Sequence, residues 1–119
     1  MSFNIEQFRN YCLNKKGTEE TFPFDESTLV MKLRGKMYAL TDIDDQFSIT
    51  LKIDPEYSIE LKEKYEAISD AYHMNKKHWI NYTPDNSLSE KEIYKLIDDS
   101  YNLIKNKLTK KAQKELDKL

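Results

Sequence analysis

Apolar and polar residues alternate along this chain with two different periods, and the first period met is helical. Phe8 and Cys12 lie four residues apart, which puts both side chains on one face of a helix. Asn4 precedes them as a helix N-cap, and Gln7, three residues later, completes a capping-box pattern. We therefore predict a first helix that begins after Asn4 and ends near residues 16–17.

A period of two residues follows, after a stretch at residues 18–27 that shows no regular pattern. A first strand is predicted at residues 29–34 and a second at residues 37–41. Residues 35–36 fit a two-residue hairpin loop, since their glycine supplies the positive φ that such turns need. The third strand, residues 47–53, has an apolar residue at every second position.

The hairpin loop determines which side chains share a face of the sheet. With residues 35–36 as the loop, and with the buried faces of the second and third strands matched, Leu40 lies opposite Ile49 and Tyr38 opposite Leu51. The open face then carries one row of Arg34, Met37 and Lys52 and a second row of Lys32, Ala39 and Thr50.

Helical spacing returns in the second half of the chain. An N-cap acid and a proline at the first helical position, residues 54–55, start a second helix. A fourth strand is predicted at residues 78–83. Ser87 and Glu90 form a capping-box pattern ahead of the longest helix, and Thr109 is the N-cap of a short final helix.

These elements define an α+β fold in a single domain, residues 1–119, with the element order α-β-β-β-α-β-α-α. An antiparallel β-meander and one additional strand pack against N-terminal, middle and C-terminal helices. The chain has two glycines and three prolines in 119 residues, and 12% of its residues are aromatic. This composition indicates a packed core and excludes a disordered or low-complexity chain.

Several classes of protein are excluded by composition and by the N-terminal residues. A single cysteine, Cys12, allows no intrachain disulfide and no cysteine-based zinc site. The N-terminus has neither a basic region nor an apolar region of a secretory signal, and no apolar run is long enough to span a bilayer. We therefore expect a soluble, cytoplasmic protein with no cofactor, monomeric and without a membrane partner.

Nineteen basic and twenty-one acidic residues give a formal net charge of −2, but the predicted sheet segregates these charges. Lys32, Arg34, Lys36 and Lys52 gather at one end of its open face, whereas three acids occupy residues 42–45 at the other. Clustered cations on neighbouring strands repel one another, which favours an anionic partner. The alternative is an ordinary solvated face on which lysines discourage edge-to-edge aggregation.

The segment from residue 72 to residue 79 is the most unusual part of the chain. It contains both histidines, His73 and His78, the only tryptophan, Trp79, and the adjacent Lys76 and Lys77, without one acid. Lysines contact phosphates and aromatic rings stack on bases, so this composition suits nucleic acid. The alternative is a core tryptophan that follows an exposed turn. The five-residue spacing of the histidines matches no metal-binding pattern.

The last fifteen residues form a second basic region. Six lysines and two acids lie between Lys105 and Leu119, which gives this region a net charge of +4. A basic amphipathic helix can contact nucleic acid or a membrane surface. A solubilising final helix with cations near its end is the alternative.

Three segments of the chain resemble the MmcQ/YjbR family. They are Phe22-Pro23-Phe24, the hairpin segment at residues 35–40, and the string His-Met-Asn-Lys-Lys-His-Trp at residues 73–79. Ser100-Tyr101 in the long helix also matches. The resemblance implies an α+β fold related to CyaY and type III secretion chaperones, and a small bacterial DNA-binding protein with a "double wing" arrangement. Asp25 and Ala71 stand where the family commonly has glycine.

The sequence thus leads to a non-enzymatic protein that binds DNA weakly, with little sequence preference, through phosphate contacts. The expected contact residues are Lys32, Arg34, Lys36, Lys52, Lys76, Lys77, His73, His78 and Trp79. The alternative is a protein-binding or small-molecule-binding module whose groove is lined by Phe22, Phe24, Tyr72 and Trp79. An enzyme that uses a histidine ranks third, and we expect no catalytic residue and no metal.

Overall fold

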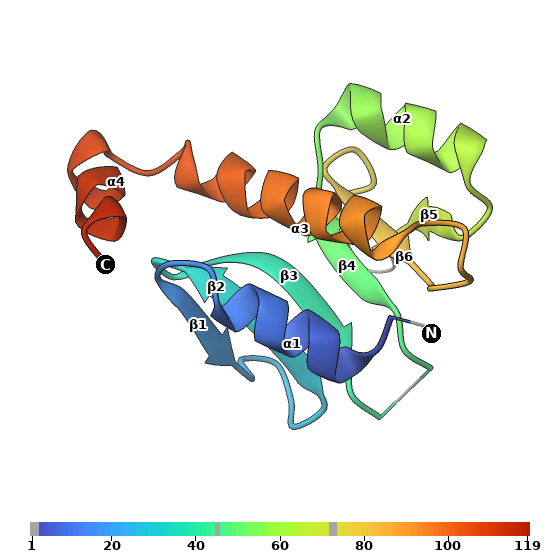
Figure 1. The fold of residues 1–119 in the computed structure, drawn as a ribbon, viewed down its shortest axis with the longest axis horizontal. Coiled ribbons are helices and arrows are strands. Elements are labelled where there is room, and N and C mark those ends of the chain that lie inside the picture. Colours follow the sequence, from blue (N-terminus) through green and yellow to red (C-terminus); the bar gives the residue numbers. More distant parts are fainter. Residues whose placement is uncertain (1–2, 45, 72–73) are drawn as a thin grey trace.

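The computed structural model describes residues 3–44, 46–71 and 74–119 of the chain. An antiparallel sheet of six strands, in the order β1-β2-β3-β4-β6-β5, forms its centre (Figure 1). The strands are β1 (Thr18–Thr21), β2 (Thr28–Leu33), β3 (Lys36–Asp42), β4 (Ile49–Lys52), β5 (Ile68–Asp70) and β6 (Trp79–Tyr82). The helices are α1 (Ile5–Leu13), α2 (Pro55–Lys64), α3 (Glu90–Lys105) and α4 (Lys110–Asp117).

The predicted α+β class is confirmed, and the order gains two short strands that the sequence pattern did not reveal. β1 has the sequence Thr-Glu-Glu-Thr, which contains no apolar residue and so shows no alternation. It is a strand because it pairs with β2. β5 has three residues, too few to show a period, and pairs with β6. Both are edge strands of the sheet. Pairing with a neighbouring strand, rather than local pattern, creates them.

The predicted hairpin loop is displaced by one residue, and the predicted strand register is wrong. Leu33 pairs with Lys36, so the turn consists of Arg34 and Gly35, with φ angles of 51° and 81°. A tight hairpin whose two central residues both have positive φ is of the I′ type, which takes glycine at its second position. The predicted loop, residues 35–36, has this glycine first, so every predicted pair between β2 and β3 differs from the observed one.

A β-bulge at Tyr38 changes which residues of β3 are buried, so the predicted buried face is wrong as well. Met31 pairs with Ala39 and Lys32 with Met37, so Tyr38 is the additional residue on β3. Bulges re-aim side chains, and here Tyr38 and Ala39 both enter the core. Leu40 therefore lies on the opposite face, across from Thr50 rather than from Ile49 as predicted.

The hydroxyl of Ser100 occupies the gap that the bulge opens between β3 and β4. Its Oγ donates a hydrogen bond to the backbone oxygen of Tyr38 and accepts one, at 2.9 Å, from the backbone N–H of Lys52. These backbone groups lie beyond the last pair between the two strands, Ala39 with Leu51. One buried side chain of α3 thus completes the sheet where its own ladder stops.

The long helix starts two residues later than predicted. Ser89 and Glu92, not Ser87 and Glu90, make the reciprocal bonds of the capping box. With Ser89 as the N-cap, the preceding Leu88 and the fourth helical residue Ile93 are both buried, as a hydrophobic staple requires. The apolar pair therefore decides between two equally spaced capping boxes.

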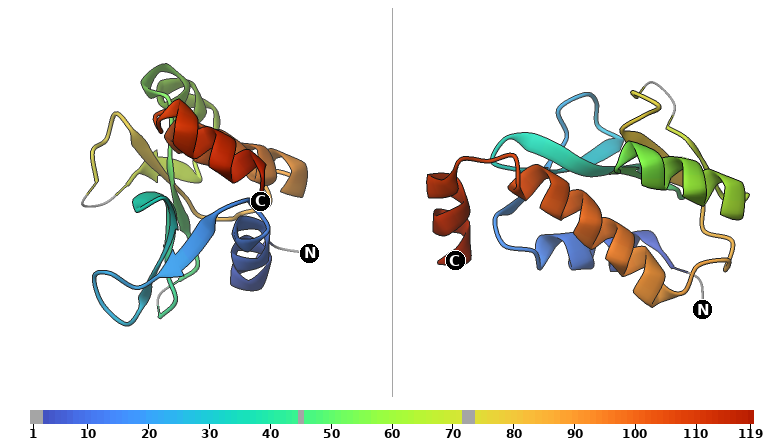
Figure 2. Two further views of the ribbon diagram at one scale, coloured as in Figure 1. Left: turned by 90° about the vertical axis from the view of Figure 1, so that its left-hand side faces the viewer. Right: turned by 90° about the horizontal axis from the view of Figure 1, so that it is seen from above.

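The core lies on one face of the sheet. α1 and α3 cover this face, while α2 lies beside the β4–β6–β5 end (Figures 1 and 2). Buried side chains from both helices meet inward side chains of the strands, among them Phe8, Cys12, Ile93, Ile97, Tyr101, Met31, Leu33, Leu51 and Ile80. None of the helices formed by the described residues covers the other face, which is called the outer face below. No helix in the described part of the chain is long and apolar enough to cross a membrane.

The last helix, α4, is anchored by one buried side chain at the end of the β1–β2 pair. Leu116 is 1% exposed and packs against Gly17, whose φ is 79°. A Cβ on Gly17 would lie 2.3 Å from a methyl carbon of Leu116. Glycine at this position therefore serves both the backbone conformation and the seating of α4.

We expect Gly17→Ala to lower the free energy of unfolding by about 2 kcal/mol, from the left-handed backbone and the displaced methyl together. Gly35→Ala is the matched control, because Gly35 has a φ of 81° but no atom within 4 Å of the added Cβ. It should cost about 1 kcal/mol. Urea unfolding measures both values, and equal losses in the two variants would contradict the contact with Leu116.

Candidate nucleic-acid interface

A row of side chains crosses all six strands on the outer face. The cross-strand pairs place Thr21, Val30, Leu40, Thr50, Asn81 and Ser69 side by side in this row. Hydroxyl and amide groups occupy the row from β4 onward, where the Thr50 hydroxyl donates to the Asn81 side-chain oxygen at 3.2 Å. Val30 is fully buried, so the exposed middle of the row combines the half-buried Leu40 with hydrogen-bonding groups.

Two loops rise on the outer face, away from the helices (Figure 2). One is the aromatic loop, residues 22–27, which joins β1 to β2. The other is the lysine loop, of which residues 74–78 are described, between β5 and β6. Asp25 shapes the aromatic loop by accepting hydrogen bonds from the backbone N–H groups of Ser27 and Thr28 at 2.9 and 2.7 Å. The two loops give the outer face raised borders.

A basic row lies toward the lysine-loop end of the outer face. Lys32 pairs with Met37, and Lys52 pairs with Trp79 at the end of β4. The Lys52 ammonium lies 5.1 Å from the centre of the Trp79 ring, an attractive cation–π contact. Trp79 is 7% exposed, so its ring supports Lys52 and is not available for stacking on a base. This row replaces the two rows that the sequence analysis predicted.

Positive charge is concentrated around Lys52. Burial, and then the charge of Lys107 at the end of α3, lower the pKa of the Lys52 ammonium below its usual value. An anion beside Lys52 would relieve the repulsion between these two cations. Lys107 belongs to the basic C-terminal region at residues 105–119, and its influence on Lys52 depends on how α3 crosses the sheet.

The lysine loop adds three exposed groups, those of Lys76, Lys77 and His78. The side chain of Asn75 accepts from the Lys77 backbone N–H at 2.9 Å and thus shapes the turn. The backbone oxygen of His78 accepts from Ile53 at 2.8 Å, which ties the loop to the end of β4. His73 and Tyr72, which the sequence analysis also named, lie outside the described residues.

Arg34 and Lys36 are not brought to the basic row. Arg34 stands in the hairpin turn, and its guanidinium lies 3.6 Å from Glu115 of α4. Lys36 pairs with Leu33, whose side chain is in the core, so Lys36 belongs to the helix-covered side of the sheet. The predicted cluster of four cations is therefore reduced, on the outer face, to Lys32 and Lys52.

Acids border the interface at three places. Glu19 on β1 pairs directly with Lys32, and no hydrogen bond or ion pair joins their side chains within the described structure. Asp42 ends β3 at the other end of the outer face. Asp70 forms an ion pair with Lys62. The hydrogen bond from Lys62 lowers the pKa of the Asp70 carboxyl, and the charge of Lys76 lowers it further by a smaller amount. The outer face thus carries Lys32 and Lys52 at one end and Asp42 at the other, but Glu19 beside Lys32 makes this segregation only partial.

A hollow of about 450 Å³ lies between the aromatic loop and the start of the lysine loop. Its sides include Phe24 and Met74, and Leu40 and Thr50 of the row form its floor. Phe24 is 64% exposed and the neighbouring Phe22 is 45% exposed. An exposed phenylalanine at the edge of a hollow, with a second one close to it in the chain, forms an exposed apolar patch, and such patches often mark binding sites.

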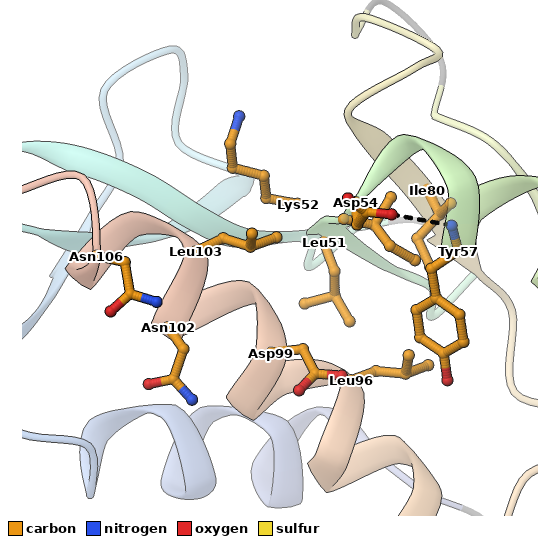
Figure 3. A pocket seen from close by; sticks show the side chains of 11 residues that line it. Leu51, Lys52, Asp54, Tyr57, Ile80, Leu96, Asp99, Asn102, Leu103 and Asn106 are labelled. Atoms are coloured by element: carbon orange, nitrogen blue, oxygen red, sulfur yellow. Dashed lines mark hydrogen bonds between the residues drawn. The ribbon is translucent and has the colours of Figure 1, made fainter.

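A second, smaller cavity of about 270 Å³ lies between β4, the start of α2 and α3 (Figure 3). Leu51, Leu96 and Leu103 form apolar parts of its wall. Its carboxylates already have structural roles, since Asp54 accepts from the backbone N–H of Tyr57 at 3.2 Å and Asp99 accepts from Lys95 at 2.9 Å. This cavity suits a small apolar molecule better than an ion.

Two observations on the described part of the chain concern metal binding and the reactivity of the cysteine. No cluster of three or more histidine, cysteine or carboxylate side chains is placed to bind a metal within those residues. Cys12 is buried, and burial raises the pKa of its thiol to about 12. A thiol held protonated in this way is a poor nucleophile.

The fold and the site define a class of small α+β proteins with an open antiparallel sheet face bordered by two loops. The family model described as YjbR matches residues 13–103, and the chain belongs to this family. The resemblance inferred from the aromatic loop, the hairpin and residues 73–79 is thereby confirmed. α4 lies beyond the matched residues.

Relatives support the assignment over most of the chain. The protein YbdF of Escherichia coli O157:H7 is 36% identical over 112 residues, covering 93% of this chain and 92% of YbdF. The protein YjbR of Escherichia coli K12 is 28% identical over 63% of this chain and 64% of YjbR. The crystal structure of DR2400 from Deinococcus radiodurans superposes with a TM-score of 0.90 at 38% identity, covering 96% of this chain and 88% of DR2400. A crystal structure from Pseudomonas syringae gives a TM-score of 0.72 at 34% identity, covering 85% of this chain and 98% of that chain.

Proposed function

We propose that this protein binds nucleic acid through phosphate contacts at the basic end of its outer face, and that it does so without catalysis. The observation that carries the proposal is the convergence of Lys32 and Lys52 on that face with the exposed Lys76 and Lys77 of the adjacent loop. Cations on separate elements, gathered around a surface that no helix covers, match the arrangement that an anionic polymer requires.

The charge distribution supports weak rather than tight binding. Glu19 beside Lys32 and the acids near Asp42 oppose phosphate binding, and the whole chain carries a net charge of −2. Phosphate contacts carry no sequence information, so we expect little sequence preference. The DNA-binding label, the "double wing" arrangement and the CyaY-like relationship that the resemblance implied are part of this proposal, as are monomeric state and action in the cytoplasm.

The test is the salt dependence of binding to labelled DNA. Fluorescence anisotropy should show an affinity that falls as salt rises from about 50 to about 200 mM, because each neutralised phosphate releases counterions. We expect Lys76→Glu combined with Lys77→Glu to weaken binding by about tenfold at low salt. The slope of log K against log salt should become less steep by the amount that about two phosphate contacts contribute.

Two further variants make this test specific. Lys91→Glu reverses an exposed charge on α3, at the helix-covered side, and should leave binding unchanged. Glu19→Gln removes the acid beside Lys32 and should strengthen binding by about twofold. A flat salt plot, or equal effects of the loop variant and Lys91→Glu, would overturn the proposal.

The second candidate is a small-molecule-binding module, and the cavity between β4, α2 and α3 favours it. Its volume of about 270 Å³ falls just below the range of typical ligand pockets, and its carboxylates are engaged within the fold. This candidate therefore ranks below the basic end of the outer face. Absence of nucleic-acid binding at low salt would favour this small-molecule-binding function over the first proposal.

A further inference from the structure

We infer that the strand bound on the outer face is single-stranded, with an unpaired base seated in the hollow between Phe24 and Met74. The inference rests on the proposed function and names the form of nucleic acid that the site takes. Its basis is the juxtaposition of an exposed aromatic side chain, a partly apolar hollow and a basic row on one uncovered face.

The hollow has the chemistry that a nucleobase requires. A base has two flat apolar faces and a polar edge, so it is held best between apolar side chains that also leave hydrogen-bonding groups within reach. Phe24, Leu40 and Met74 supply apolar surface around the hollow, and the hydroxyl-bearing Thr28, Ser48 and Thr50 supply the polar groups. Phe24, at 64% exposure, offers most of its ring to a partner.

The charges on the face set the direction of the bound nucleotide. Thr50 on the floor of the hollow is two residues from Lys52 along β4, a distance of about 7 Å. Asp42 also lines the hollow and would repel a phosphate placed there. The backbone phosphates therefore lie at the lysine end, and the bases point toward the aromatic loop. Asp42 can accept hydrogen bonds from base amino groups.

A duplex would leave these features unused. In double-stranded DNA the bases are stacked and paired inside, so phosphates reach the lysines but no flat base face reaches Phe24. Single-stranded nucleic acid is bound by combining cationic contacts along the backbone with stacking on aromatic side chains. The outer face presents both elements, one at each end.

The test compares a labelled DNA single strand of about 16 nucleotides with the blunt-ended duplex of that strand and its complement, by fluorescence anisotropy on the full chain. We expect tighter binding of the single strand. Phe24→Ala should weaken single-strand binding by about tenfold, as loss of one stacked base does, and leave duplex binding and the salt slope unchanged. Ile59→Ala is the matched control, because Ile59 is an equally exposed apolar residue on α2, at 60%.

The outcomes separate this inference from the proposed function. Salt-dependent binding that is equal for single strand and duplex, or unaffected by Phe24→Ala, overturns the single-strand inference and leaves phosphate binding intact. Absence of binding to both DNAs at low salt overturns both. If sedimentation shows a dimer that Phe24→Ala dissociates, and Phe24→Ala leaves single-strand affinity unchanged, the hollow is an interface between copies of this chain and the inference fails.

Discussion

Replacement of Ser100 by alanine is expected to lower the free energy of unfolding by about 3 kcal/mol, one of the largest effects of any single substitution proposed for this protein. Ser100 is 0% exposed, and its hydroxyl bonds two backbone groups at the bulge of β3. Without it, the buried backbone oxygen of Tyr38 and the partly buried backbone N–H of Lys52 lose this partner, and a buried group left unpaired costs about 1–3 kcal/mol.

Ser58→Ala provides the matched control for this effect. Ser58 is also buried, at 1% exposure, but its hydroxyl has no hydrogen-bond partner within the described structure. Its removal should be neutral or stabilise the protein by up to about 1 kcal/mol, because alanine has the higher helix propensity and no buried polar group remains. Urea unfolding measures both variants. Similar losses for the two would show that Ser100 does not bridge the strands.

A steep loss of stability at alkaline pH is the second large effect expected. Burial raises the pKa of the Cys12 thiol to about 12 from its ordinary value of 9.0, and burial also raises the pKa of the Tyr38 hydroxyl. Below about pH 9 both groups are protonated in the folded and the unfolded chain, and this contribution to stability is fully present. Above it, the unfolded chain releases the Cys12 proton while the folded chain retains it.

The sign of the dependence is therefore a decrease with rising pH. Between pH 9 and the folded-state value of about 12, each pH unit should cost about 1.4 kcal/mol through Cys12 alone, so about 3 kcal/mol by pH 11. Tyr38 adds to this above about pH 10.

Urea unfolding at a series of pH values, with Cys12→Ala compared with the natural chain, isolates the thiol. The variant loses some packing at neutral pH, but its stability should fall less steeply above about pH 9. The difference between the two curves removes the contribution of the lysines, which titrate in both. Parallel curves for the two proteins from neutral to alkaline pH would refute the role of Cys12.

The features that could be predicted are those that depend on interactions between residues close together in the sequence. The cap of α1 and the N-cap of α2 involve side chains that bond backbone groups two or three residues away, so they were predicted correctly. The same kind of pattern failed where two solutions were equally spaced, as with Ser87 and Ser89. There the burial of Leu88 and Ile93 decided, and burial is a property of the packed molecule.

The candidate site shows the same division. The lysine loop and the polarity of the sheet could be predicted, because they follow from charges placed along the chain. The predicted row through Arg34 is wrong, because the turn has Gly35 at its second position and Tyr38 forms a bulge. The hollow near Phe24 and the proximity of Lys107 to Lys52 depend on segments far apart in the sequence.

The sequence by itself determined the α+β class, the four helices, the main strands and the segregation of charge. Helix caps, periodicity and charge act over a few residues, so the local sequence reveals them wherever only one solution fits the pattern. Only the tertiary structure decided the edge strands, the hairpin register and which cations share the outer face. The register at the bulge depends on a hydroxyl of Ser100, which is 62 residues from Tyr38 in the chain. An interaction of that range leaves no periodic signal in the sequence around either residue.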